Sequence, residues 1–523
     1  MSDELHHECG VAALYWLDEP TSKGGPASES VSGEDVASLI PSMLLDLQNR
    51  GQLAAGMSSY NPARSQILDT FKDVGTVSEV FRMSHPAKFQ SILTEYSGKA
   101  AIGHTRYATC GGDDVRYAQP FERHHGRLWK WFSFAFNGNL ANYGELRDRL
   151  RSKRDYHFTL NTDTEIIMHA LAYRLRGDKP SALADVMRSL GRGFDGAYNL
   201  AFLDAQGRMF VARDPMGFCP MNWAVQGRLF GAASESVALA NMGFTEIHSL
   251  EPGEMAIIEK GKLHFARFAR PRHHAHCFFE WIYFSNVAST IDGSSVYMVR
   301  ARSGQRLADL EDQKLDASCI VVPVPDTAKA AADAFAFRLG IPSVEGLIRN
   351  RYVGRTFIQP ASTRKRAAKG KYTPLRAVLE GKRVFLVEDS IVRSTTLATL
   401  VRQIRDRGGA KEIHVRVACP PIVAPCFYGI DMSTLGELFA PNLVPSHYDG
   451  NLDEATLKKM AAALGVNSLR YLSVDDLSPC LRIEGKDLCR GCITGEYPST
   501  CGNKMMRQAK RNLARGQSGR TYE

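Results

Sequence analysis

The stretch from Val384 to Thr396 constrains the fold and chemistry of this 523-residue chain more than any other. Four apolar residues, 384–387, are followed directly by Glu388 and Asp389 and then by several hydroxyl side chains. A short apolar run that ends in a polar loop, followed by a helical pattern, predicts a buried strand, a loop and a helix. Ligands of such units bind beyond the carboxyl end of the strand.

The side chains of this loop suit a phosphorylated sugar. Two adjacent carboxylates can accept hydrogen bonds from both hydroxyls of a ribose, while hydroxyl side chains and backbone N–H groups at a helix start suit a phosphate. Two carboxylates repel a bare phosphate, so a sugar must lie between them and the phosphate. The alternative is a strand that ends in a solvated acidic turn, and it accounts for the two acids alone but not for the whole string.

This string resembles the phosphoribosyl diphosphate (PRPP) loop of the type I phosphoribosyltransferases, and it is most similar to that of the amidophosphoribosyltransferases. The resemblance implies that Glu388 and Asp389 bind the ribose hydroxyls. It also implies a set of residues around the 5-phosphate, namely Ser390, Arg393, Ser394, Thr395 and Thr396. The family usually has two aspartates and a glycine where this chain has Glu388 and Ser394, although the longer Glu388 side chain still reaches a ribose hydroxyl.

Cys9 follows an eight-residue leader and opens a strand-like apolar run over residues 9–16. If the leader were removed, Cys9 would carry a free α-amine with a pKa of roughly 7.7 to 8.0, close enough to neutrality to serve as base for its own thiol. One terminal residue could then be both nucleophile and base. The alternative is a buried cysteine in a first strand, because unpaired cysteine is among the most buried residue types.

Three later strings carry groups that recognise an amino acid and its amide. Arg106, in the string 103–109, can pair with an α-carboxylate, and Asp163 can hold an α-ammonium group. Asn137 and Gly138 offer an amide side chain and a glycine N–H, the two donor types of an oxyanion hole. Each string alone is a weak signal, since an Asn-Gly pair more often marks a hairpin turn.

The order of these strings resembles the class II glutamine amidotransferase domain, an N-terminal-nucleophile fold, over roughly residues 9–260. The resemblance implies that Cys9 attacks the side-chain amide of glutamine and that Asn137 and Gly138 stabilise the oxyanion. It further implies glutamine-binding roles for Arg106 and Asp163 and, through ordering of the closed site, for Arg50. Strings 47–52, 213–217 and 233–236 also match the family.

Three departures bear on the glutamine site. A segment rich in Gly, Ser, Pro and acidic residues lies within positions 18–38, where the family has a shorter turn, and we expect a flexible surface insertion. Cys219 stands where the family usually has Arg, and Leu53 replaces a polar residue. These changes affect the tuning of the site more than its existence.

From about Cys277 the chain alternates short apolar runs with helical patterns, which predicts an α/β unit with a parallel sheet. The run 320–327 matches the diphosphate loop of the phosphoribosyltransferases. By that resemblance Asp326 contributes to Mg²⁺ binding, together with Glu388 and Asp389, and Lys329 contacts PRPP. The string 350–360, which contains Arg351, matches a mobile loop that closes over PRPP and excludes water.

Cysteine spacing adds an independent signal. Cys489 and Cys492 form a Cys-x-x-Cys pair, which fits a redox dithiol, a zinc site or an iron-sulfur site equally well. Cys277 and Cys426 stand where one branch of the amidophosphoribosyltransferases has its other cluster ligands, so the resemblance implies a [4Fe–4S] cluster and, as in that branch, a cleaved leader. The tail from Lys504 to Arg520 is basic and predicts a solvated or disordered segment.

Composition excludes several other classes of protein. No apolar run approaches the roughly 20 residues needed to span a bilayer, and the N-terminus lacks a secretory apolar segment. The net charge of +9 is modest for this length, and no Lys/Arg block with interleaved aromatic residues indicates nucleic-acid binding. The eleven cysteines are an odd number, which favours thiols or metal ligands in a reducing cytoplasm over a disulfide framework.

We therefore expect a leader over residues 1–8, an α+β N-terminal-nucleophile domain with an αββα sandwich over 9–260, an α/β phosphoribosyltransferase domain over 277–470 and a tail over 471–523 that carries cluster cysteines. The resemblance implies that ammonia released from glutamine attacks C1 of Mg²⁺-bound PRPP in a homotetramer that purine nucleotides inhibit. The alternative is a diverged, non-catalytic sensor of PRPP or glutamine. Other class II amidotransferases do not account for the string 387–396.

Overall fold

The computed structural model describes residues 9–20, 35–107, 114–153, 157–160, 162–270, 273–350, 372–430, 432, 434–445 and 448–517. The leader, most of the 18–38 insertion and Arg351 with the rest of the PRPP-covering loop after Asn350 lie outside these residues. Within the described part, no helix is both long enough and apolar enough to cross a membrane.

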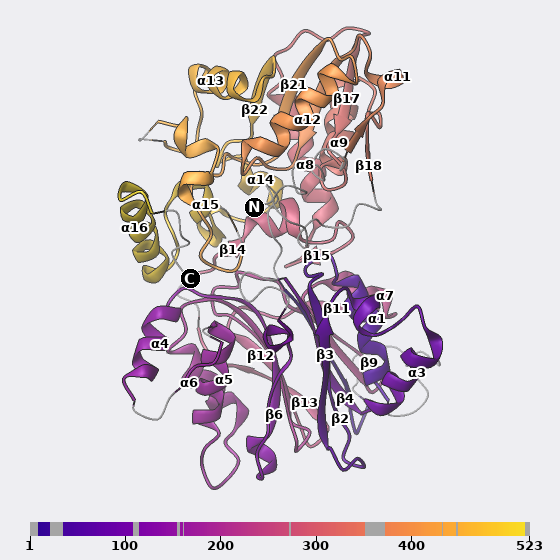
Figure 1. Ribbon diagram of the computed structural model, residues 1–523, viewed down its shortest axis with the longest axis vertical. Coiled ribbons are helices and arrows are strands. Elements are labelled where there is room, and N and C mark those ends of the chain that lie inside the picture. The colour runs from indigo at the N-terminus through magenta and orange to yellow at the C-terminus, as the bar shows by residue number, and fades with distance from the viewer. Residues whose placement is uncertain are drawn as a thin grey trace.

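The first half of the chain forms two antiparallel sheets that pack face to face (Figure 1). The seven-stranded sheet has the order β11-β9-β10-β1-β4-β2-β3 and consists of β1 (Gly10–Trp16), β2 (Ala54–Tyr60), β3 (Leu68–Val74), β4 (Ala100–Arg106), β9 (Asn222–Gln226), β10 (Leu229–Ala233) and β11 (Ile247–Ser249). The six-stranded sheet has the order β13-β12-β8-β7-β6-β5 and consists of β5 (Phe121–Arg123), β6 (Phe132–Leu140), β7 (Gly196–Asp204), β8 (Met209–Arg213), β12 (Glu254–Glu259) and β13 (Lys262–Arg267).

Helices cover the outer face of each sheet. Those on the seven-stranded sheet are α1 (Ile40–Asp46), α2 (Val77–Val80), α3 (Pro86–Glu95) and α7 (Ser236–Asn241), and those on the six-stranded sheet are α4 (Tyr143–Arg151), α5 (Asp163–Arg174) and α6 (Leu183–Gly191). Alternating apolar side chains, such as Val11 and Ala13 from β1 and Ala201 and Leu203 from β7, fill the space between the sheets. The result is a four-layer αββα sandwich.

The second half is built on a parallel sheet in the order β17-β20-β21-β22. Its strands are β17 (Cys319–Pro323), β20 (Arg383–Glu388), β21 (Glu412–Val417) and β22 (Ser468–Tyr471), and the main helices around it are α8 (Val296–Asp309), α9 (Lys329–Leu339), α12 (Ser394–Asp406) and α13 (Glu454–Leu464). Residues 384–387 are fully buried, because a parallel strand covered on both faces needs a continuous apolar run. The predicted fold class is confirmed.

The C-terminal tail returns to the junction between the two halves. Strand β23 (Leu488–Cys489) pairs in parallel with β14 (His276–Cys277), and helix α16 (Thr500–Ala514) lies beside the second half and above α4 (Figure 1), where it shares a buried cluster with residues of the first half. The prediction of a solvated or disordered tail is wrong for residues 504–514. Met506 and Ala509 are buried, and with Gly502 they make an apolar stripe at helical spacing that the many basic residues concealed.

Candidate functional site

Cys9 directly precedes β1, the central strand of the seven-stranded sheet. Gly10 pairs with Thr105 of β4, so the chain at Cys9 runs beside the end of β4, where Arg106 lies. The Cys9 Sγ atom lies 3.9 Å from the carbonyl oxygen of Tyr107, and the residue is partly exposed. The predicted nucleophile and the predicted α-carboxylate ligand therefore lie at the same strand ends.

Asn137 and Gly138 lie on β6 of the facing sheet. Asn137 is 1% exposed, and neither its Nδ2 nor its Oδ1 atom has a hydrogen-bond partner among the described residues. Gly138 has a φ of +134°, and a Cβ added there would lie 2.1 Å from the carbonyl oxygen of Ala197. Only glycine fits this backbone. A buried amide left unpaired costs free energy, so this arrangement is typical of a group that waits for a ligand.

Two residues that the sequence analysis missed hold the chain just before Asn137. The Gln119 side chain makes both hydrogen bonds of the Phe136 peptide, accepting from its N–H at 2.7 Å and donating to its carbonyl oxygen at 3.3 Å. His104 Nε2 lies 3.1 Å from the same oxygen, and burial lowers the pKa of His104 to about 3, so the ring is neutral and donates this bond. The only indication of His104 in the sequence was its position two residues before Arg106.

Arg106 lies at the end of β4, and Asp163 lies at the start of α5. Arg106 is buried, and its guanidinium lies over the ring of Tyr117 at 5.4 Å from the centroid. Asp163 begins α5 and accepts hydrogen bonds from the N–H groups of Leu140, at the end of β6, and Thr164. Burial raises the pKa of Asp163 to about 6 despite these bonds, which favour the charged form. Asp163 thus lies beside the strand that carries Asn137.

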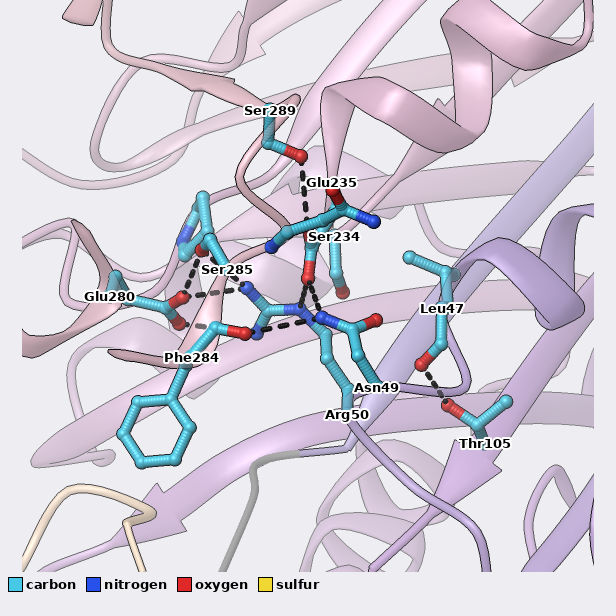
Figure 2. Close-up of polar contacts among 12 residues, drawn as sticks. Leu47, Asn49, Arg50, Thr105, Ser234, Glu235, Glu280, Phe284, Ser285 and Ser289 are labelled. Atoms are coloured by element: carbon cyan, nitrogen blue, oxygen red, sulfur yellow. Dashed lines mark hydrogen bonds and ion pairs between the residues drawn. The ribbon is translucent and has the colours of Figure 1, made fainter. Parts of the chain in front are cut away.

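Arg50 lies at the junction of the two halves, and its guanidinium joins carboxylates from both (Figure 2). Its Nε donates to Glu235 at 2.8 Å, while its two terminal nitrogens donate to Glu280 at 3.1 and 2.6 Å. Glu280 starts a π-helical turn, Glu280–Phe284, at the beginning of the second half. All three side chains are buried, so this ion-pair cluster holds the halves together instead of presenting Arg50 to solvent.

The second site is a pocket of about 320 Å³ beyond the carboxyl ends of β17 and β20. Six of the residues predicted to bind PRPP or Mg²⁺ line it, namely Asp326, Glu388, Asp389, Ser390, Arg393 and Thr396. The further lining residues that the sequence analysis did not single out include Asn49, Arg300, Thr327, Arg349 and Tyr372. Lys329, Ser394 and Thr395 do not line it, and Arg351 lies outside the described residues.

Several charged groups of this pocket have hydrogen-bond or ion-pair partners. Asp389 accepts hydrogen bonds from Thr327 and, at 2.5 Å, from Ser390. Arg349 donates to Asp326 at 2.8 Å, and Arg393 lies 3.4 Å from Glu437. Lys329, at the start of α9, pairs with Glu345 instead. No group of three or more acidic, Cys or His side chains in the described part is arranged to hold a metal ion. A magnesium ion at these acids therefore needs the oxygens of a bound diphosphate as ligands.

The four predicted cluster cysteines, Cys277, Cys426, Cys489 and Cys492, line one small cavity. Phe218 of the first half and Tyr428 and Tyr497 of the second complete its wall. Burial raises the pKa of Cys489 to about 12, so a cation is needed to keep this thiolate charged. Cys480 and Cys501 do not line the cavity, Cys319 and Cys419 are buried elsewhere, and Cys110 lies outside the described residues.

Comparisons with known proteins identify both halves together. Residues 86–251 match the model of the glutamine amidotransferase domain family. The chain is 38% identical over 499 residues to an amidophosphoribosyltransferase of Methanothermobacter thermautotrophicus, covering 95% of each protein. It is 37% identical to that of Methanocaldococcus jannaschii, covering 94% of this chain and 98% of the relative.

A solved structure agrees over nearly the whole chain. It is that of the glutamine PRPP amidotransferase from B. subtilis complexed with ADP and GMP, with a TM-score of 0.78, 33% identity, and coverage of 94% of this chain and 98% of the other. The comparisons extend across both sheet systems, so they concern the joined enzyme and not one domain alone. The chain belongs to the amidophosphoribosyltransferases, the enzymes that catalyse the first step of purine biosynthesis.

Proposed function

We propose that glutamine is hydrolysed at Cys9 once residues 1–8 have been removed. The freed α-amine takes the thiol proton, and the thiolate attacks the side-chain amide carbon of glutamine. The C–N bond breaks with proton transfer to the leaving nitrogen, so ammonia departs and a thioester remains. Water then hydrolyses the thioester to glutamate.

The buried, unpaired amide of Asn137 is the observation that carries this assignment. The attack puts negative charge on the amide oxygen, and Asn137 Nδ2 and the N–H of Gly138 are the donors proposed to receive it. Gln119 and His104 fix the preceding peptide, so these donors lose little freedom when the charge forms. We further propose that Arg106 holds the α-carboxylate of glutamine and Asp163 its α-ammonium group.

In the second pocket we propose that ammonia attacks C1 of PRPP. The new N–C1 bond forms as the C1–O bond to diphosphate breaks, and loss of a proton leaves 5-phosphoribosylamine. Glu388 and Asp389 hold the ribose hydroxyls, while Ser390, Arg393 and Thr396, with Ser394 and Thr395 at the start of α12, surround the 5-phosphate. Mg²⁺ neutralises the departing diphosphate when it is bound, and Asp326 adds a carboxylate nearby.

We propose a [4Fe–4S] cluster for the four-cysteine cavity. A single zinc ion requires sulfurs about 2.3 Å from one centre, whereas an iron-sulfur cluster needs a wider space between its four thiolates. The four cysteines line one cavity, which supports a shared metal centre, and the resemblance to the cluster-containing branch of the family favours the iron-sulfur cluster. Its place beside Phe218 and β23 suits a structural link between the tail and both halves.

Four broader assignments are also proposed. We propose that the first domain ends after β13 and not at Lys260, because β13 is an edge strand of its sheet. The nucleotides named in the B. subtilis structure support inhibition by purine nucleotides, and the family supports a homotetramer. None of the ten described cysteines forms a disulfide, which supports the reducing cytoplasm as its location.

The test is release of glutamate from glutamine by anaerobically purified protein with Mg²⁺, with and without PRPP. We expect release that increases when PRPP is present, and N-terminal sequencing should find Cys9 first. An absorbance band in the visible blue with iron and sulfide in equal amounts supports the cluster, whereas zinc without that band contradicts it. No release by protein that begins at Cys9 contradicts the catalytic roles and favours a sensor.

A further inference from the structure

The amide of Asn49 has a fixed orientation at the junction of the two halves (Figure 2). Its Nδ2 donates to Glu235 Oε1 at 2.7 Å and to the carbonyl oxygen of Phe284 at 3.1 Å. Both partners are acceptors, so the nitrogen must face them and the amide cannot be turned over. In Figure 2 the Asn49 oxygen consequently lies on the opposite side, toward Leu47 and Thr105.

This Asn49 Oδ1 atom is buried and has no hydrogen-bond partner in the described part of the chain. An unpaired buried acceptor costs free energy that a ligand with an N–H or O–H group recovers. The amide of Asn137 is also unpaired, but its proposed task is to donate to an oxyanion. Asn49 differs, because its two N–H groups already donate hydrogen bonds and only its Oδ1 atom, an acceptor, has none.

The position of Asn49 connects the two reactions. Its side chain lines the PRPP pocket together with Ser285, Arg300 and Asp389. Its own segment packs against the end of β4, where a Cβ on Gly51 would lie 2.5 Å from the carbonyl carbon of Arg106. The segment that carries Asn49 therefore lies between the end of β4, where Arg106 lies, and the PRPP pocket.

We propose that Asn49 Oδ1 accepts a hydrogen bond from ammonia on its way to C1 of PRPP. As the donor in this bond, ammonia keeps its lone pair free for the attack. The amide oxygen has no proton to give, so it cannot convert ammonia into non-nucleophilic ammonium. The neighbouring charges are paired, since Arg50 binds both Glu235 and Glu280.

The test is the substitution Asn49→Leu, which keeps the approximate shape of the side chain and removes the acceptor together with the two bonds that Nδ2 donates to Glu235 and Phe284. Glutamate and diphosphate are measured in the same reaction, and the wild-type enzyme should release them in a ratio near one. Loss of one neutral hydrogen bond corresponds to about a two- to tenfold effect. We therefore expect glutamate per diphosphate to rise by at least about twofold in this variant, with the KM for PRPP unchanged and diphosphate release restored by saturating ammonium chloride.

Ser289→Ala is the matched control, because Ser289 Oγ also donates to Glu235, at 2.8 Å, but offers no acceptor to the pocket. It should keep the ratio at one, and the same rise in this control would overturn the proposal by showing that a loosened junction suffices. A raised KM for PRPP in Asn49→Leu with a ratio of one would also overturn it and assign the acceptor to a PRPP hydroxyl. If Asn49→Leu is insoluble, Asn49→Ala removes the acceptor without adding bulk, and a ratio of one there contradicts the proposal.

Discussion

The two sites of this enzyme hold their polar groups in opposite ways. In the first half, Asn137 is buried on a strand without a partner, and Gly138 has a backbone that only glycine adopts. In the second half, Asp326 and Arg393 pair with neighbouring side chains, Arg349 and Glu437. In the first site, the hydrogen-bond donors are in place before a negative charge forms. In the second site, ion-pair partners neutralise the charged side chains until a ligand replaces those partners.

This difference follows from the ligands. The charge on the oxyanion of glutamine appears only during the reaction, so its donors must be in place beforehand and rigidly held. PRPP arrives with several negative charges, and a site of uncompensated groups for it would destabilise the unliganded fold. Ion pairs between side chains in a solvent-accessible pocket are weak. A phosphate and a magnesium ion can therefore replace the partners of these side chains when PRPP binds. Four measurements test this contrast.

The largest effect is expected for Cys9→Ala. Loss of a covalent nucleophile should lower glutamine-dependent diphosphate release by at least about a thousandfold. Ammonia-dependent release should stay within about twofold of the wild type, because the PRPP pocket lies in the other half. Cys501→Ala, which alters another partly exposed thiol, should leave both rates unchanged. Equal loss of both activities would show that the two halves are not separable in this way.

Asn137→Ala should lower kcat for glutamine hydrolysis by about 10²–10³-fold, the usual cost of one oxyanion donor. The amide makes no hydrogen bond in the described structure, so its removal takes away no polar contact. The thermal midpoint should therefore change much less than for Gln119→Ala, which loses both bonds to Phe136. Calorimetry and glutaminase rates separate the cases, and a strong destabilisation by Asn137→Ala would mean that the amide is not waiting for a ligand.

The pH profile of glutamine hydrolysis should follow Asp163. Its pKa of about 6 in the unliganded site means that the carboxylate is charged above this pH and neutral below it. Protonation of the Cys9 α-amine already lowers kcat/KM for glutamine below about pH 7.7, and because only the charged form of Asp163 holds the α-ammonium group, the fall should steepen by about a further tenfold per pH unit below the Asp163 pKa. Asp163→Asn should give a lower value that lacks this additional slope. A wild-type inflection near pH 4, typical of a solvated carboxyl, contradicts the assignment.

The smallest effect is expected for Glu437→Gln, which removes the partner of Arg393 in the PRPP pocket. A partly exposed ion pair contributes about 0.2–1 kcal/mol, so loss of this one contact of Arg393 should lower the KM for PRPP by about two- to fivefold at most. Glu380→Gln removes the partner of Arg376, another exposed pair that does not line the pocket, and should leave this KM unchanged. A higher KM in Glu437→Gln would mean that Glu437 helps binding instead of competing with it.

Local patterns made the core of each half predictable. The strand, loop and helix around residues 384–396 follow from hydrophobic periodicity, because the apolar run is uninterrupted and the polar loop begins at Glu388. The fold class and the convergence of four distant cysteines on one cavity came from the resemblance, since spacing alone defines only the pair Cys489 and Cys492.

Long-range polar contacts were not predictable in the same way. Gln119 and Asn49 belong to strings without special composition, and their partners lie 17 and 186 residues away. Glu280 did carry a signal, because an acid among Phe278, Phe279 and Trp281 must find a cation when that run is buried. Nothing local indicates that the cation is Arg50, since the pairing depends on how the two halves dock.

The cluster of Arg50, Glu235 and Glu280 also determines when the junction between the two halves can form during synthesis of the chain. The ribosome makes Arg50 and Glu235 well before Glu280. While only the first half has been synthesised, Arg50 therefore lacks its partner Glu280. Burying this arginine with an incomplete set of partners is unfavourable, and the junction therefore closes only after the second half has begun to emerge.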